Sequence, residues 1–256
     1  MREKIRLLYI LAKADFRKRF IGSYFGVVWM FIQPVVSVLI YYCVFQLGFR
    51  SNPVNDVPFV LWLIPGIVPW FFFNDALQNG VSAFVAYRHL VKKMVFDVSL
   101  IPVIKVAASL FVHIIFLAIT VIVFLCLGQK PSIWWIQSLY YVFCNIVLIA
   151  GIVYLTASVN VFVKDMGQLV NVLLQFGFWL APIMYTFEMM PTGFQTFLKL
   201  NPFCYIVEGF RDCFIYHRGI LENSYGTGYF WIVTLIVFGI GIFVFKRLET
   251  HFADVL

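Results

Sequence analysis

The sequence has little charge. Lys, Arg, Asp and Glu together make up only 12% of its 256 residues, whereas hydrophobic residues make up 62%. A soluble domain surrounds its core with a polar shell, and this chain has too little polar sequence to form one. The charged residues also fall mainly between long apolar stretches. This pattern excludes a soluble globular protein and indicates a chain that crosses a membrane several times.

Motifs that mark catalytic sites are also missing. The chain has no GxxxxGK[ST] loop and therefore lacks this means of binding and hydrolysing ATP. It has no HExxH, CxxC or GxSxG motif, and we expect no catalytic residue, cofactor or metal on it. Carboxylates are scarce within the apolar stretches, which argues against a proton- or sodium-coupled transporter. We therefore expect another chain to supply the energy.

Six apolar stretches are long enough to cross a bilayer, because a transmembrane helix needs about 20 apolar residues. The sequence predicts an all-α integral membrane protein with one domain over 1–256: an interfacial helix at 1–22, spans one to five over 26–187, an outer segment at 188–225 and span six at 229–246. The apolar stretches are Gly26–Leu47, Val60–Val81, Pro102–Leu127, Trp134–Val163, Leu169–Phe187 and Tyr229–Phe245.

The distribution of Lys and Arg predicts the orientation, because cytoplasmic loops carry the excess of basic residues. With both termini cytoplasmic, the inner side holds Arg2, Lys4, Arg6, Lys13, Arg17, Lys18, Arg19, Arg88, Lys92, Lys93, Lys105, Lys164, Lys246 and Arg247. The outer side then holds only Arg50, Lys130, Lys199, Arg211 and Arg218. No basic patch sits on a separate soluble domain, so we expect no nucleic-acid partner.

The N-terminal segment is predicted to be an amphipathic helix in the membrane surface. At helical spacing, one stripe contains Ile5, Leu8, Tyr9, Ala12, Phe16 and Phe20. Leu7, Ile10 and Leu11 lie on another face, so this helix could also contact protein. A basic membrane anchor and a specific docking role both remain open.

The segment 188–225 is predicted to form a re-entrant helical hairpin on the outer side. Its apolar run Phe203–Ile215 is too short to cross a bilayer, but it can enter and return. Glu208 and Arg211 lie three residues apart on one helical face, and we expect a buried ion pair between them. The alternative is a surface helix with a solvated pair. Cys204 and Cys213 fall in the same segment, and whether they pair is left open.

Several motifs resemble the membrane subunits of ABC-2 type exporters. The first runs from Arg19 to Pro34 and contains a basic-aromatic pair, Ser23, Gly26, Trp29 and a closing proline, with Phe25 where Leu is usual. Further matches, spread over the whole chain, are Val57-Pro58-Phe59, Gly66 with Trp70-Phe71-Phe72, Val163-Lys164-Asp165, Asn201-Pro202, Glu208-Gly209-Phe210-Arg211 and Phe252–Leu256.

Within that family the chain is most similar to exporters of O-antigen and wall teichoic acid, and the stretch Gly48–Asn52 leading into Asp56–Phe59 leans toward the teichoic acid permeases. The resemblance implies a homodimer in the bacterial plasma membrane, bound to a separate ATPase dimer that holds ATP and Mg. It also implies a lipid-linked polysaccharide as substrate. An exporter of a drug or small lipid is the alternative. A membrane glycosyltransferase is disfavoured because no inner loop has paired carboxylates, and a structural scaffold would not explain the re-entrant segment.

Two groups of residues are candidates for coupling and for substrate passage. The inner loop Tyr87–Leu100 is predicted to contain a short amphipathic helix that docks on the ATPase, with the N-terminal helix as a second candidate. The coupling residues of the inner loop would be Arg88, Leu90, Lys92, Lys93 and Met94. Aromatic rings can stack on sugar faces while a polymer slides past them. The candidate channel residues are Tyr41, Tyr42 and Phe45 in span one and Phe176 and Trp179 in span five.

Overall fold

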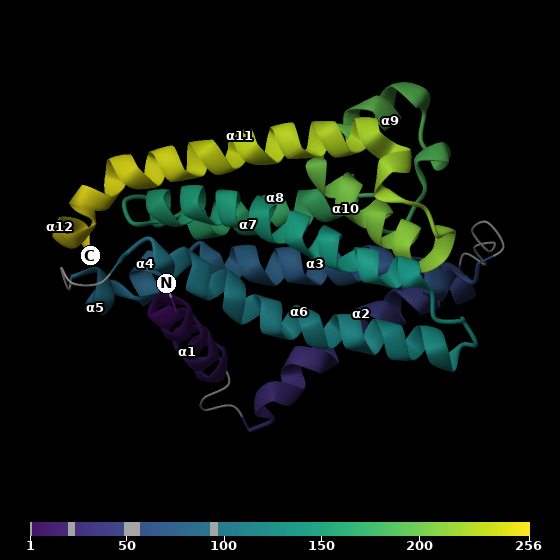
Figure 1. Ribbon diagram of the computed structural model, residues 1–256, viewed down its shortest axis with the longest axis horizontal. Helices are drawn as coiled ribbons and strands as arrows, with labels where there is room; N and C mark the ends of the chain where they lie inside the picture. Colours follow the sequence, from purple (N-terminus) through teal and green to yellow (C-terminus); the bar gives the residue numbers. More distant parts are fainter. Residues whose placement is uncertain (1, 20–23, 49–56, 93–96) are drawn as a thin grey trace.

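The computed structural model describes the backbone of all residues except 1, 20–23, 49–56 and 93–96. Side chains are described for the same residues apart from 2, 3, 27, 33, 47, 221 and 223–225. Within this part of the chain, every regular element is a helix (Figure 1). The prediction of an all-α membrane protein is therefore confirmed.

Five described helices are long and apolar enough to cross a membrane. They are α2 (Trp29–Tyr41) continued by the π-helix η2 (Tyr42–Gly48), α3 (Phe59–Gly80), α6 (Leu100–Cys126), α7 (Ser138–Asn160, preceded by the short helix η3, Ile133–Gln137) and α11 (Ser224–Leu248). The helix of predicted span five, α8 (Met166–Leu180), has only 15 residues. It ends before Phe187 because Pro182 disfavours a helical conformation at Ala181, whose backbone is extended.

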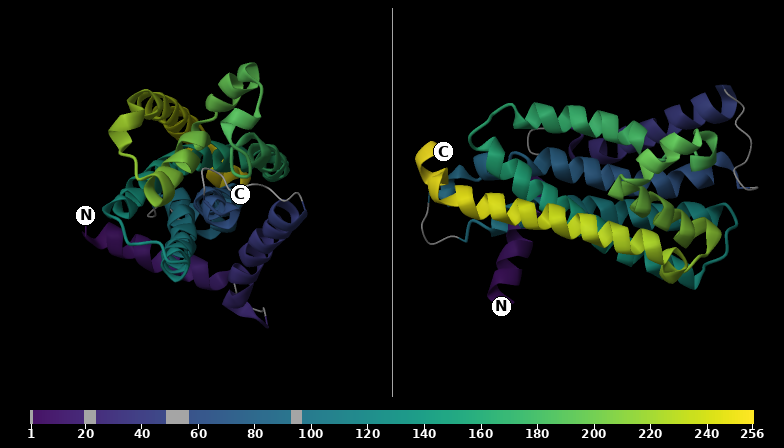
Figure 2. Two further views of the ribbon diagram at one scale, coloured as in Figure 1. Left: turned by 90° about the vertical axis from the view of Figure 1, so that its right-hand side faces the viewer. Right: turned by 90° about the horizontal axis from the view of Figure 1, so that it is seen from above.

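Helix α3 forms the centre of the bundle. It contacts α6, α7, α8 and the shorter helix α10 (Pro202–Arg211), and most of its residues are buried. It runs as one helix through Pro65 and Pro69. The buried amide of Asn145 on α7 donates a hydrogen bond of 3.1 Å to the carbonyl of Pro69. By contrast, α2 lies at the edge of the bundle, where none of its described residues is buried (Figure 2).

Helices α7 and α11 pack side by side along most of their length (Figure 1). Two glycines permit their close approach. A Cβ atom on Gly151 would lie 2.7 Å from the Cα of Phe238, and a Cβ on Gly241 would collide with the carbonyl oxygen of Gly151. Small residues at such a crossing allow close backbone packing, which drives helix association in membranes.

The two ends of the bundle differ in what they carry (Figure 1). The end that holds both termini, called the terminal end here, contains α4 (Ala83–Ala86), α5 (Arg88–Val91) and α12 (Phe252–Val255). The amphipathic helix predicted in the loop Tyr87–Leu100 is therefore only one helical turn in the described residues, and α12 packs against it. Phe252 on α12 is fully buried and contacts Phe84 and Phe245.

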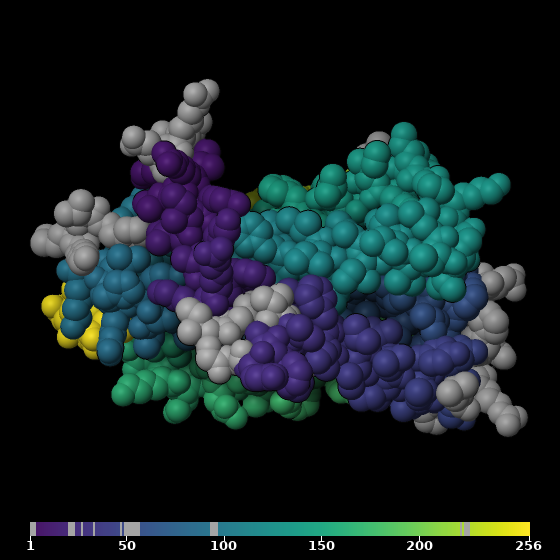
Figure 3. All heavy atoms as spheres, turned by 90° about the horizontal axis from the view of Figure 1, so that it is seen from below, coloured from purple at the N-terminus to yellow at the C-terminus, as the bar shows by residue number. Residues whose placement is uncertain are grey.

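The N-terminal helix α1 (Arg2–Lys18) lies across the terminal end and packs against α6 (Figure 3). Its buried face is centred on Ala12 and Asp15. Of the apolar stripe predicted to face the membrane surface, Ala12 belongs to this packed face, whereas Ile5 and Tyr9 are mostly exposed. Asp15 is buried because it has partners on neighbouring elements. A pattern of apolar residues does not predict the burial of such a charged side chain.

The opposite end, called the hairpin end here, carries α9 (Thr192–Lys199) and α10. Helix α10 runs antiparallel to α3. Phe203 at its start contacts Phe73 in the middle of α3, with ring centroids 4.8 Å apart, whereas Tyr216 beyond its end bonds to Trp62 near the start of α3. The start of α10 therefore lies level with Phe73 of α3, and Leu200 in the turn between α9 and α10 is exposed.

Candidate functional site

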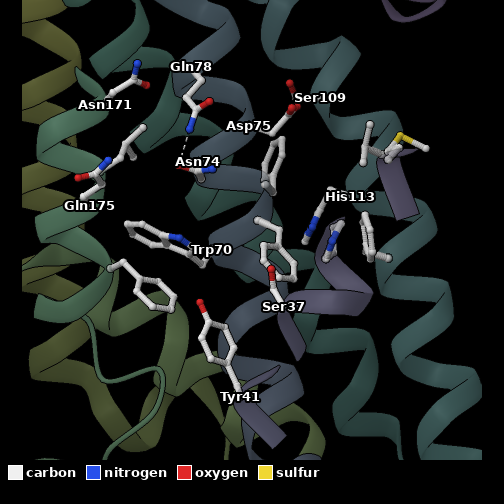
Figure 4. A pocket seen from close by; sticks show the side chains of 18 of the residues that line it. Ser37, Tyr41, Trp70, Asn74, Asp75, Gln78, Ser109, His113, Asn171 and Gln175 are labelled. Atoms are coloured by element: carbon white, nitrogen blue, oxygen red, sulfur yellow. Dashed lines mark hydrogen bonds between the residues drawn. The ribbon is translucent and has the colours of Figure 1, made fainter. Parts of the chain in front are cut away.

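A cavity of about 860 Å³ lies between α2, α3, α6 and α8 (Figure 4). It follows from the packing of α2, which leaves space between itself and the central helices. The described residues that line it are Met30, Pro34, Ser37, Tyr41, Trp70, Phe71, Phe72, Asn74, Asp75, Gln78, Ser109, Val112, His113, Phe116, Gln168, Asn171, Leu174, Gln175, Phe178 and Trp179.

The half of the cavity toward the terminal end is lined by amides. Gln168, Asn171 and Gln175 are spaced three and four residues apart and therefore lie on one face of α8. Across from them, Gln78 on α3 donates a hydrogen bond of 3.0 Å to Asn74 (Figure 4). The three α8 amides are exposed to the cavity, and none of them has a hydrogen-bond partner among the described residues. Amides at this depth in a membrane need polar partners, which a polar substrate or water would supply.

The other half of the cavity is aromatic. Tyr41 on α2 stacks on Phe178 of α8, with ring centroids 5.9 Å apart, and Trp70 on α3 contacts the same phenylalanine at 5.6 Å. Figure 4 shows Tyr41 at the end of the cavity away from Asn171 and Gln78, with Trp70 between these ends. A substrate in this cavity would therefore meet amides at one end and ring faces at the other.

Only two of the five candidate channel residues line this cavity, namely Tyr41 and Trp179. Phe45 instead stacks on Phe59 at 5.5 Å and belongs to the packing around α3. Phe176 is 65% exposed on the outer face of α8, and neither it nor Tyr42 contributes to the lining.

A network of ionic side chains closes the end of the cavity nearest α1. Arg19, just after α1, donates hydrogen bonds of 2.8 Å to Asp75 and 3.1 Å to Ser109, and both of these residues line the cavity. Asp15 accepts a hydrogen bond of 2.7 Å from Lys105 on α6 and lies 3.6 Å from Arg19. Two carboxylates and two cations therefore balance one another in a mostly buried group.

This network extends to the short helix at the terminal end. The hydroxyl of Tyr87, directly before α5, donates a hydrogen bond of 2.9 Å to Asp15. Among the candidate coupling residues, Arg88 and Lys92 are exposed there, whereas Leu90 packs partly against the core. Lys93 and Met94 lie outside the described residues. A continuous chain of side-chain contacts thus joins α5 to the cavity.

Glu208 and Arg211 lie together at the hairpin end. The Arg211 guanidinium is fully buried and donates a hydrogen bond of 2.7 Å to Glu208. It also donates one of 2.8 Å to the carbonyl of Ile183 and lies 3.5 Å from the ring centroid of Trp62. A Cβ on Gly66 would lie 2.9 Å from the guanidinium, so the absence of a side chain there makes room for it.

His113 differs from what its sequence context indicates. An isolated histidine within a span usually bonds to a neighbouring helix. The buried ring of His113 instead stacks on Phe72 at 4.8 Å, and neither of its nitrogens has a hydrogen-bond partner among the described residues. All five cysteines are free thiols, including Cys204 and Cys213. No three His, Cys, Asp or Glu side chains in the described part lie together as metal ligands would.

The sequence carries a signal for the amides of α8, called the amide wall here, which the pattern of aromatic residues does not reveal. Gln168 lies directly before the apolar stretch Leu169–Phe187, and Asn171 and Gln175 lie within it, so the three recur at i, i+3 and i+7. Polar residues at helical spacing in a span mark a face that is turned away from lipid. Asn74 and Gln78 at i and i+4 give the same signal in span two.

Comparison with known proteins identifies the class of this chain. The O-antigen export system permease protein RfbA of Klebsiella pneumoniae is 28% identical over 252 residues, which cover 98% of this chain and 95% of that protein. The polysialic acid transport protein KpsM of Escherichia coli is 24% identical over 240 residues, 92% of this chain and 90% of that protein. The inner membrane transport permease YadH of Escherichia coli K12 is 26% identical over 221 residues, 80% and 82% respectively.

The family model described as ABC-2 type transporter matches residues 6–215, which include the cavity, its ionic network and the hairpin up to Ile215. The multi-pass helical bundle agrees with that match. This chain belongs to the ABC-2 type transporter family and is a membrane-embedded subunit that works with an ABC ATPase.

Proposed function

We propose that this chain is the permease subunit of an exporter that moves a lipid-linked cell-surface polysaccharide out of the cytoplasm. The observation that carries the proposal is the match to an O-antigen export permease over 98% of this chain and 95% of the relative. A match over both whole lengths leaves no separate domain in which the relative's activity could reside. ATP and Mg are bound by the partner ATPase, since this chain has no P-loop.

The cavity supports this proposal because its two halves suit the two kinds of surface on a sugar. Hydroxyl groups both donate and accept hydrogen bonds, as the amides of Asn171 and Gln175 do. The C–H faces of a sugar ring can stack on Trp70, Tyr41 or Trp179. A drug or small-lipid exporter is the alternative function, and for it we expect a narrow apolar cavity without an amide wall.

The terminal end of the bundle is cytoplasmic in this proposal, and the hairpin end faces outward. The excess of Lys and Arg in the segments that would face inward supports this orientation. Helix α5 then docks on the ATPase through Arg88, Leu90 and Lys92, with Lys93 and Met94 following in the same loop. The contact from Tyr87 through Asp15 and Arg19 to Asp75 would carry its movement to the cavity.

The complete exporter is proposed to be a homodimer on an ATPase dimer. The cavity is only partly enclosed, and the exposed residues Leu173, Phe176 and Val172 of α8 give a partner an apolar surface beside it. A second copy placed there would shield the path of the polymer from lipid. The α9–α10 hairpin enters the membrane from outside, because Phe203 reaches the level of Phe73 in the central helix.

Deletion of the gene tests the function directly. We expect the deletion strain to lose a surface polysaccharide and to accumulate its lipid-linked form on the cytoplasmic face of the membrane, and we expect the wild-type gene to restore export. Replacement of Leu90 by Asp should abolish export while the protein still inserts, because a charge would enter an apolar contact. Replacement of the exposed Val85 by Asp is the control. An unchanged surface polysaccharide in the deletion strain would refute the proposed function.

Orientation is tested separately by impermeant thiol labelling of single-cysteine variants in a cysteine-free background. Lys92→Cys should be labelled only in opened cells, whereas Gln129→Cys should be labelled in intact cells. The reverse result would place the terminal end outside.

A further inference from the structure

We infer that the cavity selects an uncharged, hydroxyl-rich glycan and disfavours a polyanion. This inference rests on the proposed function and names the chemical class of its substrate. Cell-surface polysaccharides differ in charge. Some are neutral, whereas sialic acid polymers and phosphodiester-linked chains are polyanions, and the inference assigns this protein to the neutral class.

The charges around the cavity carry the inference. None of the described residues that line it is Lys or Arg, and Asp75 is its one carboxylate. A polyanion carries a negative charge on every repeat, and each charge at membrane depth needs a cationic partner or water. The described part of the lining offers no such cation.

Arg19 does not supply the missing cation. Its guanidinium is bound to Asp75 at 2.8 Å and lies 3.6 Å from Asp15. Lys105 is likewise bound to Asp15 at 2.7 Å. The two cations and two carboxylates of this group cancel, so an anion that bound to Arg19 would have to separate it from Asp75 and leave that carboxylate without its partner.

The amide wall supplies what a neutral glycan needs instead. Gln168, Asn171 and Gln175 extend over about 10 Å of α8, at 1.5 Å per residue. Each amide has two donor hydrogens and an acceptor oxygen, which matches the mixed donors and acceptors of sugar hydroxyls. Because these amides have no hydrogen-bond partner among the described residues, they remain available to a chain that passes through the cavity.

Chemical analysis of the exported polymer is the first test. Surface polysaccharide from the wild type and the deletion strain is fractionated by anion exchange and assayed for phosphate and sialic acid. We expect the polymer that disappears on deletion to elute without salt and to contain neither group. Disappearance of a polyanion would overturn the inference and leave the proposed function standing, whereas no disappearance would overturn the proposed function itself.

Binding is the second test and uses the complete complex with its ATPase in lipid nanodiscs. A neutral glucose oligosaccharide and an oligosialic acid of the same length are titrated calorimetrically at low and high salt. We expect the neutral probe to bind with an affinity that does not depend on salt, and the oligosialic acid to bind at least tenfold more weakly. Equal or tighter binding of the oligosialic acid, or no binding of the neutral probe, would overturn the inference.

Substitutions in the wall give the test its specificity. The double variant Asn171→Leu, Gln175→Leu should bind the neutral probe about tenfold or more weakly, because it loses two hydrogen-bonding amides. Asn171→Lys should bind the oligosialic acid about tenfold more tightly than the parent at low salt. The control is Gln129→Leu, which removes an exposed amide at the hairpin end of α6 and should change neither affinity. Equal effects of the control and the double variant would contradict a role for the wall.

Discussion

Arg211 donates a hydrogen bond of 2.8 Å to the backbone carbonyl of Ile183, which lies in the irregular segment directly after α8. This contact explains how span five can end early. Irregular backbone inside a membrane protein requires partners from the protein itself, because lipid offers none. The Arg211 side chain provides one of these partners and also binds Glu208.

Replacement of Arg211 by Ala should lower the stability of the purified protein by about 3–5 kcal/mol, because it breaks a buried ion pair and strands a carbonyl. Glu208→Ala should also destabilise, since it leaves the buried guanidinium without its carboxylate. The exchange Glu208→Arg with Arg211→Glu should recover little. A glutamate at position 211 donates no hydrogen bond to Ile183 and no cation to the Trp62 ring. Thermal unfolding in detergent measures all three.

Gly66→Ala gives an independent test of the same site. Its new methyl group would lie 2.9 Å from the guanidinium, which fills a packed interior. We expect a loss of about 1–3 kcal/mol, as for other overpacked positions. Gly193→Ala on α9 is the matched control, because a Cβ there meets open space. If the two variants unfold at the same temperature, Arg211 has room to move and the site is looser than the structure shows.

The crossing of α7 and α11 gives a second prediction. Gly241→Ala should destabilise by about 1–3 kcal/mol, because its Cβ collides with the carbonyl of Gly151 and pushes two backbones apart. Gly239→Ala, on the same helix, meets open space and should be neutral or slightly stabilising, since Ala is the better helix former. Folded yield and thermal unfolding compare the pair. If Gly241→Ala leaves the stability unchanged, the two helices do not cross as closely as described.

The ionic network gives a third prediction. Asp15→Ala should destabilise by about 3–5 kcal/mol, because it leaves Lys105 unpaired in a mostly buried position. Asp97→Ala removes the carboxylate of the exposed pair with Lys4 and should cost under about 1 kcal/mol. The measurement is the midpoint of thermal unfolding for each variant and the parent. Equal, small effects would mean that the Asp15 group is solvated.

Asp212 makes stability depend on pH in a stated direction. It lies beyond α10, outside the five long apolar helices, where burial and the negative charge of Glu208 raise the pKa of its carboxyl to about 6. The folded protein therefore takes up a proton at a higher pH than the unfolded chain does. Folding gains stability as pH falls from 7 through about 6 toward 5.

This gain should be absent from Asp212→Asn, which has no titrating carboxyl at that position. The unfolding temperatures of both proteins are compared between pH 7.5 and 5. Identical profiles would show that Asp212 is not buried enough to be shifted.

The sequence was sufficient to predict the spans and the helical class, because about 20 consecutive apolar residues are required at each crossing. The exception is span five. Apolar content continues to Phe187, but α8 ends at Leu180 because Pro182 restricts the residue before it. The composition of a segment shows how hydrophobic it is. The end of α8 depends instead on the backbone conformation that Pro182 allows at Ala181.

The candidate site was harder to predict. Tyr41 and Phe45 are four residues apart in predicted span one, yet only Tyr41 lines the cavity, because Phe45 packs on Phe59. Which aromatic faces the substrate depends on the position of α2 relative to α3. That position is a tertiary property, and the periodicity of one helix does not specify it.

The contact between Glu208 and Arg211 could be predicted because residues three apart lie on the same face of a helix. The bond from Arg211 to Ile183 could not, since 28 residues separate the two and nothing local marks a carbonyl that lacks a partner. The same holds for Asp15 and Lys105, which are 90 residues apart.

The bond between Arg211 and Ile183 also has a consequence for biosynthesis. At about 5–20 residues per second, the ribosome adds Arg211 roughly 1.5–6 s after Ile183. During that interval the segment after α8 has to be accommodated by the insertion machinery or by water, because its protein partner has not yet been made. The fifth span is therefore completed only when the hairpin emerges. A truncation before residue 211 removes the side chain that holds the hairpin, and it also leaves the segment after α8 without its partner.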